Sequence, residues 1–446
     1  MSQRILSAIA LAMAAGLPPA AAQGPAPPAD LADYVNRPEP DFAWKLVGTA
    51  ESDAATVYTL HLVSQKWHDE VWEHDLQVFL PKGVTAPTGM VLYNTGGKPI
   101  TMTTLVGAEI ARRTGLPVAM LFGVPKQPLY GGKKEDALIA ETFVRYLDTG
   151  DGTWPLLFPM AKSVVKAMDA LQAFAKAEWK ADVTGFVVTG ASKRGWTSWL
   201  TAATGDRRVK GIAPMVIDTL NFQKQLPLHL KSFGGYSQMI HDYKERNLLP
   251  LPDTAAGRRL WTMVDPWVYR EKLTLPKMII NGTNDPYWPQ EALNQYWDDL
   301  AGEKSVLLVP NAGHDLREVG ADGAKQPYPI RAVNTLAAFS RHVLAGKPMP
   351  ALAWKHSDED GQAYLAVESD LPMKAVRLWE AASTTRDFRK SRWAVGPTAR
   401  TNVLKTGLGT PFPAEGYKAF FAECDYEVDG LPFTLSTQLR VIEARK

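Results

Sequence analysis

The chain of 446 residues has little of several features that would point to a particular class of protein. It has one cysteine, Cys424, so no disulfide can form within it and its stability must come from its core. Its 49 basic and 47 acidic residues nearly cancel, which argues against a nucleic-acid-binding protein with a basic surface. Its 8 histidines never stand in a His-x-x-x-His spacing, so we predict neither a metal site nor a cofactor.

Apolar runs long enough to span a membrane are also lacking beyond the first residues. Residues 1–22 have the pattern of a secretory signal peptide, in which Arg4 precedes an apolar stretch and small residues end at Ala22. Residues 23–33 contain Gly-Pro-Ala-Pro-Pro and are typical of a Pro-rich linker. We therefore expect an exported protein, periplasmic or secreted, with no membrane span.

What the chain does have is a hydrophobic fraction of 46%, spread over more residues than one ordinary domain needs. Alternating strand and helix patterns predict an α/β domain over residues 34–346, and short strand-like runs predict a β-sandwich-like domain over residues 347–446. An aromatic-rich insertion at about residues 219–275 forms either a cap over a site or a small core of its own. The role of residues 347–446 stays open between carbohydrate contact, partner binding and packing, and the oligomeric state stays unknown.

The most informative stretch is Thr-Gly-Ala-Ser-Lys-Arg-Gly-Trp, residues 189–196. The apolar run at 186–188 predicts a buried strand before it, and the residues after it predict a helix. Ser192 then stands on a tight turn between strand and helix, which is the geometry of an activated nucleophile. Gly190 favours such a turn because it has no Cβ to crowd the neighbouring strand.

Two candidate partners follow, each just after a predicted strand. Asp285 follows the apolar run at 278–280, and His314 follows the run at 305–310. Open α/β sheets place their chemistry at the carboxyl ends of parallel strands. The order Ser, Asp, His is the chain order of the α/β-hydrolase fold, a mostly parallel central sheet with helices on both faces. We predict that Ser192 is the nucleophile, His314 the general base and Asp285 the acid that orients the imidazole.

Backbone N–H groups are predicted to stabilise the developing oxyanion. One belongs to Lys193 at the start of the predicted helix, and the other to Gly97 in the loop 95–98. Arg194 stands where a G-x-S-x-G motif has a small residue, and Gly195 comes one position later. Two interpretations of Arg194 are open. It points into the site and binds a substrate carboxylate or the oxyanion, or Lys193 and Arg194 are surface charges.

A second carboxylate competes for the role of the acid. Asp218 follows the predicted strand at 211–217, one strand earlier than Asp285. We prefer Asp285 and keep Asp218 as the alternative.

The motifs Gly-Ala-Ser-Lys-Arg-Gly-Trp, Gly-Thr-Asn-Asp-Pro-Tyr-Trp and Asn-Ala-Gly-His-Asp resemble those of the PhoPQ-activated pathogenicity-related proteins. The similarity runs from about Tyr34 to the C-terminus. The resemblance implies an α/β-hydrolase core, a secreted or periplasmic location, and a triad at Ser192, Asp285 and His314. The serine turn is also loosely similar to that of glucuronoyl esterases, which carry a cation beside the serine.

These patterns together predict a serine hydrolase that cleaves a carboxylic ester through an acyl-enzyme. Its substrate would be a small molecule, a peptide or a glycan, and not a nucleic acid. One alternative is a peptidase that uses the same triad on an amide. The other is a non-catalytic binding or signalling protein on a hydrolase scaffold, since a fold does not determine a function.

Overall fold

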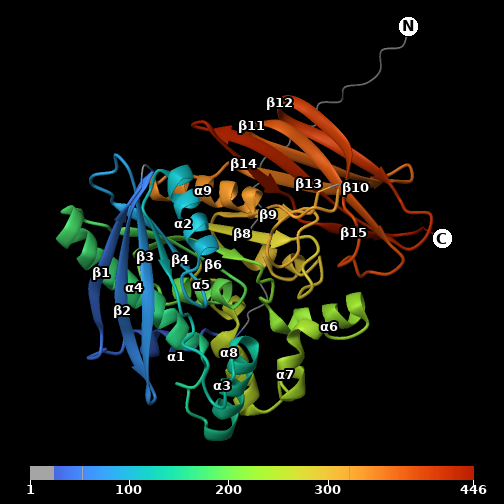
Figure 1. Ribbon diagram of the computed structural model, residues 1–446. Coiled ribbons are helices and arrows are strands. Elements are labelled where there is room, and N and C mark those ends of the chain that lie inside the picture. Colours follow the sequence, from blue (N-terminus) through green and yellow to red (C-terminus); the bar gives the residue numbers. More distant parts are fainter. Residues whose placement is uncertain (1–24, 53, 321, 446) are drawn as a thin grey trace.

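A computed structural model of the chain describes residues 25–52, 54–320 and 322–445. The predicted signal peptide and the start of the predicted linker lie outside the described residues. Within the described part of the chain, no helix is long and apolar enough to cross a membrane. The molecule is organised around one long mixed sheet with helices on its faces (Figure 1).

The centre of the sheet is parallel and fully inside the molecule. Its strands hydrogen-bond in the order β5-β4-β6-β7-β8-β9, so the chain crosses over once before it proceeds along the sheet. Both faces are covered, and these strands are therefore nearly continuous runs of buried residues. Their bounds are β4 (Gly89–Asn94), β5 (Val118–Leu121), β6 (Gly185–Ala191), β7 (Val209–Met215), β8 (Lys277–Gly282) and β9 (Lys304–Val309).

An antiparallel group of strands extends the sheet at its N-terminal edge. These strands pair in sequence order and join the parallel centre where β3 pairs with β5. Their bounds are β1 (Ala43–Glu51), β2 (Ala55–Trp67) and β3 (Glu70–Pro81).

Two hydrophobic cores lie on the two faces of the sheet. One face is covered by α4 and α5, with α1 packed on α4, and the other by α2 and α9. Helix α4 continues into a π-helical turn, η1 (Ala175–Trp179). This strand order with helices on both faces is the α/β-hydrolase fold, which confirms the predicted fold class. The helix bounds are α1 (Asp30–Val35), α2 (Thr101–Thr114), α4 (Leu157–Phe174), α5 (Lys193–Ala203) and α9 (Ile330–Leu344).

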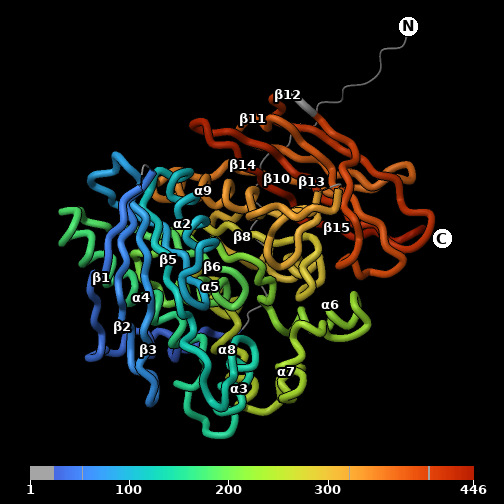
Figure 2. The backbone as a smooth tube through the Cα atoms, viewed as in Figure 1, coloured from blue at the N-terminus to red at the C-terminus, as the bar shows by residue number. Residues whose placement is uncertain are grey.

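The insertion between β7 and β8 is mostly helical. Figure 2 shows the chain running out through α6 and α7 and returning through α8. Helices α7 and α8 contact α3, so the insertion is braced against the loop region that follows β5. The bounds are α3 (Glu135–Thr149), α6 (Phe222–Phe233), α7 (His241–Glu245) and α8 (Ala255–Val264).

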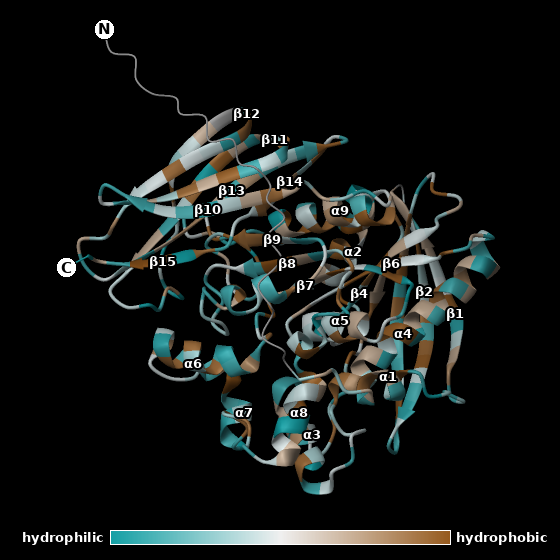
Figure 3. Cartoon of the chain, turned by 180° about the vertical axis from the view of Figure 1, so that it is seen from behind, coloured by the Kyte–Doolittle hydropathy of each residue, from teal (hydrophilic) through white to brown (hydrophobic). Residues whose placement is uncertain are grey.

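The C-terminal strands are antiparallel and continue the same sheet, because Ser436 of β14 pairs with Val306 of β9. Figure 3 colours the C-terminal strands by hydropathy, and along much of β11 buried residues alternate with exposed ones, as expected for a strand with one covered face. Most residues of β13 are buried instead. Cys424 of β13 is buried in one of the two hydrophobic cores. The bounds are β10 (Leu352–Glu359), β11 (Gln362–Ser383), β12 (Ala394–Pro411), β13 (Tyr417–Val428), β14 (Leu431–Ser436) and β15 (Arg440–Glu443).

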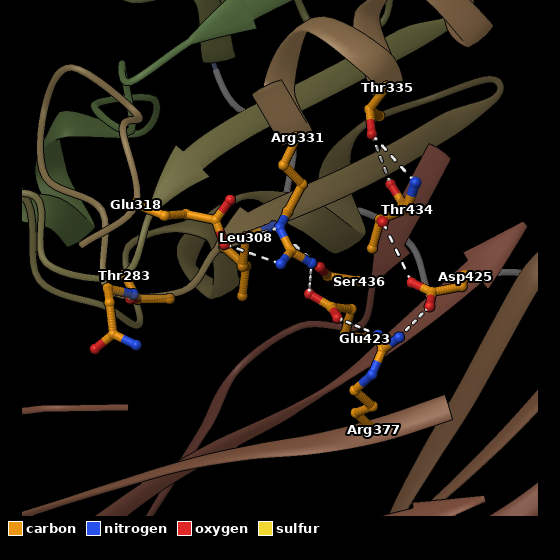
Figure 4. A network of polar contacts seen from close by, with 11 residues as sticks. Thr283, Leu308, Glu318, Arg331, Thr335, Arg377, Glu423, Asp425, Thr434 and Ser436 are labelled. Atoms are coloured by element: carbon orange, nitrogen blue, oxygen red, sulfur yellow. Dashed lines mark hydrogen bonds and ion pairs between the residues drawn. The ribbon is translucent and has the colours of Figure 1, made fainter. Parts of the chain in front are cut away.

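A network of ion pairs joins the C-terminal strands to the hydrolase part (Figure 4). Glu423 of β13 is fully buried and lies between Arg331 of α9 and Arg377 of β11. Arg331 also pairs with Glu318, at 2.9 Å, in the segment that follows His314. Breaking a buried pair leaves an uncompensated charge, so this junction resists separation.

Candidate active site

Ser192 lies between β6 and α5 in an unusual backbone conformation. Its φ of 59° and ψ of −130° lie outside the regions that most residues adopt. The Ser192 amide donates to the Met215 carbonyl at 2.8 Å, and the Trp196 amide donates to the Ser192 carbonyl at 3.0 Å to begin the helix. The turn at Ser192 between β6 and α5, here called the elbow, is thus fixed on both sides, and the serine is held at the carboxyl end of β6.

The glycine one position later than in G-x-S-x-G has a packing role. A Cβ on Gly195 would lie 2.6 Å from Ile217 Cγ2 and 3.0 Å from the Met215 carbonyl oxygen. Gly195 therefore lets α5 approach the end of β7. Gly190 is equally confined, since its Cβ would lie 2.6 Å from the Asn94 amide nitrogen.

Arg194 and Lys193 are not surface charges, so that interpretation is wrong. Their residues are only 8% and 6% exposed. Arg194 donates through Nε to the Val124 carbonyl at 2.5 Å, and through Nη1 and Nη2 to the two carboxylate oxygens of Glu135, at 2.6 and 2.8 Å. Lys193 Nζ lies 2.9 Å from Glu135 and 3.1 Å from Asp136. Three Arg194 donors are already engaged by protein oxygens, so the interpretation as a substrate-binding cation gains no support.

Glu135 is held as a carboxylate by these two cations. Burial acts to raise the pKa of Glu135, but the hydrogen bonds and charge of Arg194 and the charge of Lys193 hold it well below the ordinary range. The guanidinium also lies against Gly96, where a Cβ would collide with it. One buried arginine therefore connects the elbow, the loop 95–98 and the start of α3.

Asp285 and His314 are brought together after the ends of β8 and β9. His314 Nδ1 donates to Asp285 Oδ2 at 2.8 Å, and the Tyr287 amide donates to Asp285 Oδ1 at 2.8 Å. The Tyr287 ring stacks on the imidazole with 4.2 Å between centroids. His314 Nε2 is buried and has no hydrogen-bond partner among the described residues. The bond from Ser192 to this nitrogen is not formed here, and such bonds often tighten only when a substrate binds.

Asp218, the alternative acid, makes other contacts. The Tyr296 hydroxyl donates to Asp218 Oδ1 at 2.5 Å. Burial raises the pKa of Asp218 to about 7, the Tyr296 hydrogen bond opposes the rise, and the charge of Asp285 adds to it. An acid partner of imidazole must be ionised and must accept its Nδ1–H, and in this structure Asp285 makes that bond.

Ser192 opens into an apolar pocket beneath the cap. It holds about 760 Å³ of space between atoms, part of it open to solvent. His229 of α6 is buried in its wall, and burial together with the charge of Arg389 lowers the pKa of that histidine to about 4, so it is neutral at physiological pH. Gly97, with a φ of 65°, is not among the lining residues. The apolar lining comprises Phe143, Trp196, Ile217, Phe222, Leu226, Ile240, Tyr243, Leu248, Leu249, Leu251, Tyr287 and Trp288.

Several residues of the site are not singled out by sequence reasoning. Asn94, at the end of β4, donates through Nδ2 to the Thr189 carbonyl at 2.7 Å and to Ser198 Oγ at 3.1 Å, and so ties the start of the loop 95–98 to β6 and α5. Its position two residues before the Gly96-Gly97 pair is the one signal that could have found it. Glu135 carries no such signal. Among the described residues, no group of three or more His, Cys, Asp or Glu could hold a metal ion.

The strand order and the serine elbow define the class of the chain as an α/β-hydrolase. More narrowly, it belongs to the family described as PhoPQ-activated pathogenicity-related protein, whose model matches residues 31–389. The predicted family is thus confirmed.

Individual relatives are more distant. Autocrine proliferation repressor protein A of Dictyostelium discoideum is 29% identical over 435 residues, which cover 89% of this chain and 85% of that protein. An acetyl xylan esterase from Paenibacillus sp. R4 is 17% identical, with a TM-score of 0.45 over 64% of this chain and 87% of that one. A glucuronoyl esterase from Solibacter usitatus is 12% identical, with a TM-score of 0.43 over 71% of this chain and 91% of that one. These similarities identify no substrate for this chain.

Proposed function

We propose that the protein is an exported serine hydrolase that cleaves a carboxylic ester through an acyl-enzyme. The observation that carries the proposal is the Asp285–His314 hydrogen bond, which leaves His314 Nε2 buried, without a partner in the described part of the chain, and on the same edge of the sheet as Ser192. An imidazole oriented by a carboxylate through Nδ1 is the arrangement that a general base needs.

The residues divide the reaction as follows. Ser192 Oγ attacks the ester carbonyl carbon while its proton passes to His314 Nε2, and Asp285 stabilises the imidazolium. The backbone N–H groups of Lys193 and of the loop that contains Gly97 bind the oxyanion. When the intermediate collapses, the alcohol leaves with the proton from Nε2. Water then attacks the acyl-enzyme by the same route and releases the carboxylic acid.

The pocket supports an ester with a bulky apolar group. Its wall is formed mainly by aromatic and aliphatic side chains, and the histidine within it is uncharged. Burying a CH₂ group in such a wall contributes about 0.8 kcal/mol. We therefore expect hexanoyl and benzoyl esters to be cleaved with a higher kcat/KM than acetyl esters.

The non-catalytic alternative has one observation in its favour. The Dictyostelium relative carries the name of a repressor of proliferation, which describes a regulatory effect and not a reaction. On this alternative, Ser192 would be inert and the pocket would bind a ligand without turning it over.

A fluorophosphonate probe separates the two proposals. We expect covalent labelling of the wild type and none of Ser192→Ala. If neither labels while both are folded by circular dichroism, the hydrolase proposal is wrong. Hydrolysis of dipeptide amides in place of esters would favour the peptidase alternative.

A pair of neighbouring substitutions tests the acyl pocket. Ile240 is buried and lines it, whereas Met239 is 39% exposed and does not. Ile240→Trp should lower kcat/KM for p-nitrophenyl hexanoate by at least tenfold more than for the acetate. Met239→Trp, in the same turn, should leave that ratio unchanged. An unaltered ratio in Ile240→Trp would place the acyl group elsewhere.

A further inference from the structure

The loop of residues 384–393, which joins β11 to β12, lies against the loop that carries Asp285. Asn284, the residue just before Asp285, donates through Nδ2 towards three carbonyl oxygens of this loop. The distances are 2.7 Å to Ser391, 3.2 Å to Arg389 and 3.4 Å to Phe388. A single amide nitrogen thus gathers the backbone of the C-terminal loop beside the candidate acid.

The same loop also contacts the turn that carries His314. Asn311, three residues before His314, donates through Nδ2 to the Trp393 carbonyl at 2.9 Å and accepts from the Trp393 amide at 2.8 Å. Asn311 has a φ of 54°, a conformation that asparagine tolerates better than most residues. The side chain therefore pairs with Trp393 much as a neighbouring strand would, and it fixes the start of the histidine turn.

The acid and base loops are also connected to each other. The backbone N–H of Asn311 donates to Thr283 Oγ1 at 3.0 Å, and Thr283 Oγ1 donates to the side-chain oxygen Oδ1 of Asn284 at 2.9 Å. The backbone N–H of Asn284 donates to the Ala312 carbonyl at 2.9 Å. These bonds connect Asn284, Thr283 and Asn311 to one another. The side chains of the two asparagines in turn bind the loop of residues 384–393.

The C-terminal loop is itself anchored. Trp393 is 2% exposed, and its ring packs 5.4 Å from that of Phe421 of β13. The Arg389 guanidinium lies 3.8 Å from the ring centroid of Phe233 at the end of α6, and Arg386 pairs with Glu291. The loop is held by the C-terminal strands on one side and by the cap on the other, so it can act as a fixed support.

We propose that residues 384–393 form a positioning element for the Asp285–His314 pair, through Asn284 and Asn311 as positioning residues. The inference rests on the proposed function and gives the C-terminal strands a part in it. Partners that orient catalytic groups hold them within fractions of an ångström, and a misplacement of 1 Å can cost about 10²-fold in rate. The C-terminal strands therefore help to build the site.

The full-length chain offers a matched control. Asn294 also donates to a C-terminal backbone carbonyl, Leu439 at 2.8 Å, and accepts from Gln438 at 3.0 Å, but it lies on neither loop. We compare Asn284→Ala, Asn311→Gly and Asn294→Ala. Glycine tolerates the positive φ at position 311, so the substitution removes the side-chain amide without straining the backbone. Asn311→Asp, which retains the acceptor for the Trp393 amide, serves as the conservative variant.

With p-nitrophenyl hexanoate, Asn284→Ala and Asn311→Gly should lose about 10- to 100-fold in kcat with KM within about twofold. Asn311→Asp should recover part of the loss, and Asn294→Ala should stay within about twofold of the wild type. Equal losses in all three asparagine variants, or none in Asn284→Ala and Asn311→Gly, would overturn the proposal.

A spectroscopic measurement separates this proposal from the proposed function. The proton between His314 Nδ1 and Asp285 should give a low-field signal in the proton NMR spectrum of the wild type, absent from His314→Ala. We expect it to weaken or shift in Asn284→Ala and Asn311→Gly and to persist in Asn294→Ala. If the wild type cleaves no ester but these signals behave as expected, the reaction is wrong and the positioning stands. An unchanged signal in Asn284→Ala would refute the positioning.

Discussion

The two halves of the candidate site are held in place by different physical means. The Ser192 half is fixed by charge: Arg194 and Lys193 are buried against Glu135 and Asp136. The Asp285–His314 half is fixed by uncharged amides, which bind backbone carbonyls of a loop about a hundred residues further along the chain.

This difference separates two kinds of dependence. The charged half is contained within the α/β core, and breaking it leaves a buried cation without its partner, which is costly. The neutral half depends on strands beyond the parallel sheet, and each of its hydrogen bonds contributes only about 1 kcal/mol net. Substitutions in the charged half should therefore mainly lower the free energy of unfolding, and substitutions in the neutral half should mainly lower kcat.

The largest expected effect concerns the identity of the acid. Asp285→Asn should lower kcat by about 10⁴-fold, because the amide no longer fixes the imidazole tautomer. Asp218→Asn should keep kcat within a few-fold, because Asp218 bonds Tyr296 and not His314. Steady-state hydrolysis of p-nitrophenyl hexanoate measures both. A large loss of kcat in Asp218→Asn alone would show that Asp218, after the neighbouring strand, is the acid. The Asp285–His314 half would then not be a catalytic unit.

A smaller effect is expected when the charged half is broken. Glu135→Gln should lower the free energy of unfolding by about 2 kcal/mol, below the 3–5 kcal/mol of a deeply buried pair because the Glu135 side chain is 41% exposed. Urea unfolding followed by tryptophan fluorescence measures it. The control is Glu51→Gln, since Glu51 pairs with Lys82 on the surface, and no measurable change is expected there. Equal behaviour of the two variants would show that the ion pair between Arg194 and Glu135 does not stabilise the protein.

The fold was predictable from local patterns. The apolar runs at 186–188 and 278–280 lie in β6 and β8, and all of the run at 305–310 but Pro310 lies in β9, because buried parallel strands are nearly continuous apolar runs. The edge of α4 was less predictable, since the change to a π-helical turn at Ala175 leaves no clear signal.

The site was predictable only where its residues follow strands. Ser192, Asp285 and His314 stand just after apolar runs, so their common edge follows from topology. The partner of Arg194 lies 59 residues earlier, and those of Asn284 lie 104 to 107 residues later. Contacts of that range depend on tertiary packing, which residue spacing does not encode. This is why neither interpretation of Arg194 included Glu135.

The pH dependence of stability should have opposite signs at two carboxylates. The lowered pKa of Glu135 means that its stabilisation is complete above the unfolded value of about 4.5 and is lost as the pH falls below it. The raised pKa of Asp218 means that its stabilisation is complete below about 3.8 and is lost as the pH rises through about 7.

Unfolding free energies measured from pH 4 to pH 8 test these signs. The deficit of Glu135→Gln relative to the wild type should shrink towards pH 4. Asp218→Asn should gain on the wild type between pH 4 and pH 7 and then level off. A pH-independent difference for Asp218→Asn would mean that Asp218 is ionised throughout, contrary to the effect of its burial on its pKa.

The smallest expected effect asks how much of the Asp285–His314 half the hydrolase core supports by itself. Tyr287 is the support that the core supplies, because its ring stacks on His314 and its amide binds Asp285. Tyr287→Phe keeps the stacking and should retain the wild-type kcat, whereas Tyr287→Leu should lose about fivefold, since such an aromatic pair contributes about 1 kcal/mol. Both changes leave the backbone bond intact. If Tyr287→Leu instead lost more kcat than Asn284→Ala in the same assay, the His314 imidazole would be held chiefly by the hydrolase core. Both halves would then depend on that core, and they would differ only in whether their contacts are charged.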